Sequence, residues 1–140
     1  PQGDGADHDG HHTLTAVDLS DLDAPAIVWQ STDLGGTVRS LAWAGDLAAL
    51  AIDSWVRIYD LGDDAAGPMP VSQSFAEDAY QRGLLWDGTV LYTGDLKVYD
   101  VSDASSPVLL GRGSGARSRL YRRDDAIVTS AGVYPVQCAL

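Results

Sequence analysis

A short pattern occurs three times in this chain, and the repetition constrains the fold more than any other feature of the sequence. The copies are AVDLSDLDAP from position 16, IYDLGDDAAGP from position 58 and VYDVSDASSP from position 98. Aligned on their first Asp, they place Asp18, Asp60 and Asp100 at intervals of 42 and 40 residues. A period of roughly 20–50 residues is typical of stacked supersecondary units. We therefore expect a fold built from one repeated unit.

Each copy has the composition of a strand that ends in a turn. Apolar or aromatic residues precede the first Asp, a second Asp follows three positions later, and a Pro then opens another apolar stretch. Asp side chains accept backbone N–H groups in turns, and Pro begins a strand without needing a donor. We therefore predict that Asp18, Asp60 and Asp100 cap the turn between two strands.

A second pattern lies between these anchors: RSLAW from position 39, RGLLW from 82 and RSRLY from 117. A polar turn and a short apolar run follow each of them. One period therefore contains four short strands in about 40 residues, which is the unit of a β-propeller blade. The recurring arginines are Arg39, Arg82 and Arg117, and the recurring aromatic residues are Trp43, Trp86 and Tyr121. We expect the aromatic residues to occupy equivalent sites between blades, each with one large face buried.

Composition agrees with many short strands and restricts the partners. The 140 residues include 19 Asp against the single Glu77, together with 15 Gly, and both Asp and Gly favour turns over helices. The net charge of -11 argues against nucleic acid as a partner, because phosphates would be repelled. No apolar run approaches the roughly 20 residues needed to span a bilayer. Cys138 is the single cysteine, so it forms no disulfide within the chain.

The stretch QRGLLWDGTVLYTGDLKVYDVSDASSPVLLGRG resembles the LVIVD-type repeat of bacterial and archaeal propeller proteins, which are often secreted or surface-exposed. The resemblance covers most of residues 13–136, is clearest at LKVYDVSDASSP and fades at GVYPVQCAL, where Gln137 replaces the anchor Asp or the anchor is lost. It implies a scaffold or binding role, with a location outside the cytoplasm or in the cell envelope. It names no catalytic residue to carry over.

The expected fold is an all-β, incomplete propeller of four-stranded antiparallel blades. A closed propeller takes roughly 4 to 8 blades, whereas this chain holds about three and a half repeats, so we expect it to be a piece of a longer protein. The expected parts are an acidic, His-rich loop or terminus (1–12), the end of one blade (13–35), two blades (36–80 and 81–116) and the start of another (117–140).

The recurring arginines are the first candidate binding residues. They stand at the start of what should be the innermost strand of each blade, so three in register would form a ring for a small anionic ligand or a peptide carboxylate. The alternative is structural: each Arg forms an ion pair with an Asp of a neighbouring turn, such as Asp60 or Asp100.

Metal ligands form a second candidate group. His8, His11 and His12 gather in one acidic loop, and histidine with carboxylate suits zinc or another transition metal. Three glycines in the same loop favour a solvated segment instead. The Asp triplets of the repeats offer oxygen ligands for calcium, but turn capping already explains them. We therefore expect no cofactor.

The leading functional hypothesis is a non-catalytic binding or scaffold propeller whose partner is a protein or a small anionic ligand. The alternative is a hydrolase or lyase with its site on the channel face. Two carboxylates beside an Arg and a Tyr would favour the enzyme, and a lining of Val, Leu and Ala would favour the scaffold. An open arc of blades would also expose apolar sheet faces, so we expect it to be completed by further blades or to self-associate.

Overall fold

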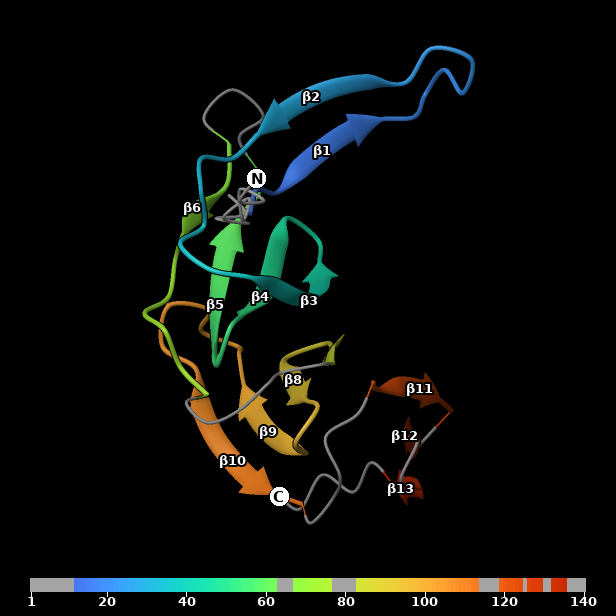
Figure 1. Cartoon of the computed structure of the whole chain (residues 1–140). Coiled ribbons are helices and arrows are strands. Elements are labelled where there is room, and N and C mark those ends of the chain that lie inside the picture. The colour runs from blue at the N-terminus through green and yellow to red at the C-terminus, as the bar shows by residue number, and fades with distance from the viewer. Residues whose placement is uncertain are drawn as a thin grey trace, which may run out of the picture.

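The computed structural model describes residues 12–62, 67–76, 83–113, 119–124, 126–129 and 132–135. These residues contain no helix, and all strand pairs in them are antiparallel (Figure 1). The all-β prediction is therefore confirmed. Across the described ranges, no helix has the length and apolarity that crossing a membrane requires.

The described strands form four sheets. A two-stranded ribbon contains β1 (Thr15–Asp18) and β2 (Ala26–Gln30). The next sheet contains β3 (Val38–Ala44), β4 (Leu47–Ile52), β5 (Trp55–Asp60) and β6 (Met69–Pro70) in that order. The third contains β7 (Leu84–Asp87), β8 (Val90–Thr93), β9 (Lys97–Asp100) and β10 (Val108–Arg112). The last contains β11 (Tyr121–Arg123), β12 (Ala126–Thr129) and β13 (Gly132–Pro135).

The three anchor aspartates occupy the same place in three sheets. Each is the last residue of its strand, and its carboxylate accepts the backbone N–H two residues later, at 2.8 Å in all three turns. Each also pairs across the hairpin with the residue that follows the repeat Pro. These pairs are Asp18 with Ala26, Asp60 with Met69, and Asp100 with Val108. The predicted capping of these turns is confirmed.

The first hairpin is also repeated in the three larger sheets. The turn between β3 and β4 has two residues, and so does the turn between β7 and β8; they begin with Gly45 and Gly88, both at φ 58°. In the β11–β12 turn Asp124 takes this place at φ 52°. A left-handed conformation suits Gly and is tolerated by Asp, so two different residue types can take the first position of this turn.

The β3–β6 and β7–β10 sheets pack face to face with their first strands side by side. The backbone N–H of Leu84 in β7 donates to Ser40 Oγ in β3 at 3.0 Å, which places the starts of both strands at the same end. The core between them is asymmetric. Small side chains of the β3–β6 sheet (Ala42, Ala49, Ala51, Val56 and Ile58) meet larger ones of the next sheet (Leu84, Trp86, Leu91 and Tyr99).

The opposite face of the β7–β10 sheet packs against the β11–β13 sheet. Tyr92 and Leu96 meet Leu120 and Ile127 there. An ion pair between Asp87 at the end of β7 and Arg122 in β11 joins the same two sheets. Three consecutive sheets are therefore stacked in chain order, with their first-hairpin ends on the same side (Figure 1).

The expectation for the recurring aromatic residues is only partly met. Trp43 and Trp86 are equivalent, because each pairs with the second residue after the first turn. Trp86 packs against the core, but Trp43 is 68% exposed. The equivalence proposed for Tyr121 is wrong. Arg122 takes this position by pairing with Ile127, whereas Tyr121 pairs with Val128 and so faces the other side of the sheet.

Candidate functional site

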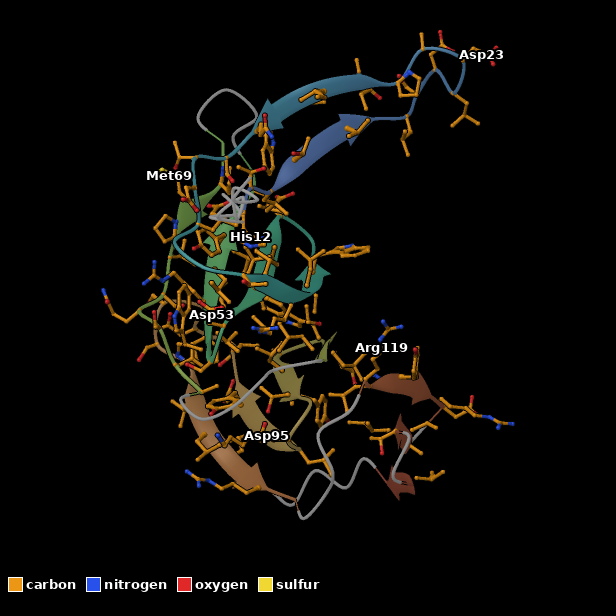
Figure 2. The ribbon with its side chains drawn as sticks, viewed as in Figure 1. His12, Asp23, Asp53, Met69, Asp95 and Arg119 are labelled. Atoms are coloured by element: carbon orange, nitrogen blue, oxygen red, sulfur yellow. The ribbon has the colours of Figure 1, made fainter. Side chains whose placement is uncertain are left out.

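Charged side chains of the two four-stranded sheets lie at the same end of their sheets. In an antiparallel meander, the start of the first strand and the turn between the second and third strands lie at the same end. We call this the first-strand end. It contains Arg39 and Asp53 in the β3–β6 sheet and Asp95 and Lys97 in the β7–β10 sheet. Figure 2 labels Asp53 and Asp95, one from each sheet.

Arg39 is paired within its own sheet. Its guanidinium lies 3.8 Å from a carboxylate oxygen of Asp53 in the β4–β5 turn. The structural alternative, an ion pair with an Asp of a neighbouring turn, is therefore met at Arg39. Its partner is Asp53 and not Asp60 or Asp100, which end their strands at the opposite end of the sheets. The pair remains partly exposed at both side chains, so the structure leaves it in contact with solvent.

The position of Asp53 depends on close contact with the strand connection before β3. Its backbone N–H donates to Thr37 O at 2.9 Å, and its carboxylate accepts the N–H of Thr37 at 3.2 Å. Asp53 adopts φ 49°, and a Cβ on Gly36 would collide with its carboxylate. Gly36 therefore allows the turn to come near enough for these two hydrogen bonds and for the Arg39 pair.

The β8–β9 turn holds a second, more buried pair. Lys97 Nζ lies 3.0 Å from Asp95 Oδ2, and Lys97 is the only buried charged residue among the described ones. Thr93 Oγ1 donates to Asp95 Oδ1, and it accepts the backbone N–H of Lys97 at 3.2 Å. Burial opposes ionisation of Asp95, but hydrogen bonds from Thr93 and Lys97 outweigh it, so the pKa of Asp95 lies below 3.8.

Tyr99 follows Lys97 on the same face of β9. Burial and, second, the negative charge of Asp95 raise the pKa of its phenol above 10.0, so the phenol is protonated at neutral pH. The cluster therefore contains a carboxylate, an ammonium group and a neutral phenol. The two charges already neutralise one another, which suits orientation of a polar group better than proton transfer.

Several predicted site residues lie outside the described residues: Arg82, Arg117, His8 and His11. The ring of the three arginines therefore stays a prediction. The backbone carbonyl of His12 accepts the N–H of Leu34 at 2.9 Å. Within the described ranges, no group of three or more His, Cys, Asp or Glu side chains is placed to hold a metal ion. Among the described residues of the Asp triplets, Asp18, Asp21 and Asp60 each accept a backbone N–H through the carboxylate.

The Asp95–Lys97 pair is not among the site residues expected from the sequence. A signal was present in TGDLK, where Asp and Lys stand two residues apart in a turn next to a Thr. That pattern is common on solvated surfaces, and nothing in its spacing indicates that the pair is buried.

Comparison with known proteins adds no assignment. No family model matches the chain, and no curated protein matches it either.

Proposed function

We propose that the chain is a section of a β-propeller of LVIVD-type repeats and acts as a non-catalytic binding or scaffold module. The observation that carries this proposal is the shared register of the anchors: Asp60 and Asp100 both pair with the residue after the repeat Pro on one side. On the other side each pairs with the first residue of the second strand, Leu47 or Val90. Following the resemblance, we propose a location outside the cytoplasm or in the cell envelope.

The arrangement of charges supports binding over catalysis. Asp53 and Asp95 are each engaged with a cation and with a hydrogen-bond donor. In β3 and β7 the charged residues are Arg39 and Asp87, and they stand at opposite ends of the two strands. A carboxylate pair of the kind used by hydrolases is therefore absent from these two strands.

The ligand best suited to the first-strand end is a small carboxylate or a peptide C-terminus. Arg39 is exposed enough to contact one, and guanidinium groups bind carboxylates with two parallel hydrogen bonds. The remaining two groups of the proposed site are Arg82 and Arg117.

Calorimetric titration with citrate and with a short peptide that has a free C-terminus tests this ligand class. The wild type should bind, and a variant with Arg39→Gln, Arg82→Gln and Arg117→Gln should lose binding at least tenfold. Arg123→Gln is the matched control, because Arg123 is exposed at the opposite end of β11. Equal binding by the triple variant, or no binding by the wild type, would reject the anion site.

A further inference from the structure

The β1–β2 ribbon has apolar side chains that nothing in the described part of the chain covers. Val17 and Val28 are about half exposed, and Ile27 is 67% exposed. The tip of the ribbon, near Asp23, extends away from the other sheets (Figure 2). Two-stranded hairpins are marginal in water, and at least three strands or a packing partner are needed for stability. The ribbon is thus a surface suited to another strand.

The repeat shows which strand belongs beside β1. In the equivalent sheets, β5 and β9 pair with the fourth strand on one edge and with the second strand, β4 or β8, on the other. β1 pairs with β2 alone among the described strands. Its residues include neither Lys nor Pro, which commonly protect an edge strand.

The backbone N–H of Leu19 also lacks the acceptor that its equivalents have. The N–H that follows the anchor Asp donates to the first-hairpin turn in both complete sheets: Leu61 to Asp46 O at 2.7 Å, and Val101 to Thr89 O at 2.8 Å. Leu19 follows the anchor Asp18 in the same way. None of the described residues accepts its N–H.

The face of β3 that contains Trp43 is exposed as well. The equivalent Trp86 is covered by the β3–β4 hairpin of the preceding sheet, which presents the small side chains of Ala42, Ala49 and Ala51. Trp43, at 68% exposed, and Leu41 lie on the corresponding face of β3 without such cover. The apolar face and the open edge of β1 belong to the same gap in the stack of sheets.

We infer that β1 and the Trp43 face form an acceptor for a β-hairpin of the type that β3–β4 makes in this chain. The second strand of that hairpin adds antiparallel to β1, with its first residue opposite Asp18, as Leu47 is opposite Asp60. Its turn carbonyl accepts the N–H of Leu19, and its small side chains lie over Trp43. The inference goes beyond the proposed binding function and does not require the anion site.

The test adds the hairpin to the full chain. The sequence of residues 38–52, fused to a soluble carrier, supplies the probe. We expect a one-to-one complex by light scattering, and amide hydrogen exchange in residues 15–19 slowed at least tenfold. A control probe has Lys at the two positions that correspond to Ala49 and Ala51. This probe should not bind, because in the proposed complex these positions face Trp43.

A variant of the acceptor separates docking from non-specific association. Trp43→Lys should weaken binding at least tenfold while its circular dichroism stays unchanged, because Trp43 is exposed. Leu110→Lys, an exposed apolar position on β10, is the control and should bind as the wild type does. Unchanged exchange in residues 15–19, or equal binding by the Trp43 variant, would overturn the inference. Anion titrations are unaffected by either result, so the two proposals fail separately.

Discussion

Trp43 in β3 and Trp86 in β7 hold the same register position in consecutive sheets, but only Trp86 is packed between two sheets. Trp86 contacts the core, and its indole N–H donates to Gly88 O at 3.0 Å, whereas Trp43 is 68% exposed. The surroundings of the two residues differ while their local geometry is the same. Stability measurements can therefore separate the contribution of packing from that of the hairpin.

Replacing each Trp with Ala should have unequal effects. Trp86→Ala should lower the free energy of unfolding by about 2–4 kcal/mol, because it leaves a gap beside Leu91 and Tyr99. Trp43→Ala should cost less than about 1 kcal/mol, as exposed substitutions do. Urea unfolding followed by circular dichroism measures both values, and equal losses would show that the two sites are not packed as described.

The anchor turns should be sensitive to the Asp side chain and insensitive to calcium. In Asp100→Ala the N–H of Ser102 loses its acceptor, so the melting temperature should fall by a few degrees. Asp100→Asn should lose less, because its amide oxygen still accepts. A wild-type melting temperature that rises sharply with millimolar calcium, and not in Asp100→Ala, would contradict the capping role.

The sequence was most informative where structure is local. The turn after Asp100 is determined within a few residues by Asp, Ser and Pro, so its hydrogen bond and its register were predictable. The position of Tyr121 was not, because RSRLYRRDD has one more residue before its turn than RSLAWAGD. The additional residue moves Tyr121 to the other face of the sheet and places Arg122 at the position equivalent to Trp43 and Trp86. Only the strand pairing reveals this shift.

Contacts between distant segments were beyond the sequence. Arg39 reaches Asp53 because the connection before β3 packs on the β4–β5 turn, where Gly36 leaves room. The burial of Lys97 was equally unpredictable, because a Lys beside a polar turn is ordinarily exposed. Neither is encoded by spacing along the chain.

The Asp95–Lys97 pair should make stability depend on acid pH. The pKa of Asp95 is lowered in the folded chain from 3.8, so its ionised form stabilises folding above about pH 4. This contribution is lost as the pH falls from the ordinary value through the lowered one. The stability difference between wild type and Asp95→Asn should therefore be constant from pH 5 to 7 and shrink below pH 4.

A double substitution provides the control for this pair. Asp95→Asn leaves the Lys97 ammonium buried without its counter-charge, and at pH 7 it should cost about 1–2 kcal/mol, less than for a fully buried pair because Asp95 is partly exposed. Asp95→Asn with Lys97→Met should recover part of that loss. A single and a double variant of equal stability would contradict the electrostatic account.

The β11–β12 turn offers a stabilising substitution. Asp124 has φ 52° where the equivalent turns have Gly45 and Gly88. Asp124→Gly should raise the free energy of unfolding by about 0.5–1 kcal/mol, because Gly adopts this conformation without strain. The hydrogen bond from Arg122 Nε to the backbone carbonyl of residue 124 is retained. Gly88→Ala is the reciprocal control and should lose about 1–2 kcal/mol; a loss in Asp124→Gly would show that its side chain has another role.

The exposed ribbon should make the free chain self-associate at micromolar concentration. Leu22 is 77% exposed at its tip and Ile27 is 67% exposed in β2, while β1 has an unpaired edge among the described strands. Exposed apolar edges pair with other chains. Multi-angle light scattering should show species larger than a monomer, and Ile27→Lys should reduce them because a charge would be buried in the contact.

Val133→Lys, at a similarly exposed position in β13, is the matched control and should change little. A sharp monomer peak for the wild type would show that the ribbon is not a contact surface. Since the hairpin probe competes for the same edge, it should disperse these assemblies into one-to-one complexes.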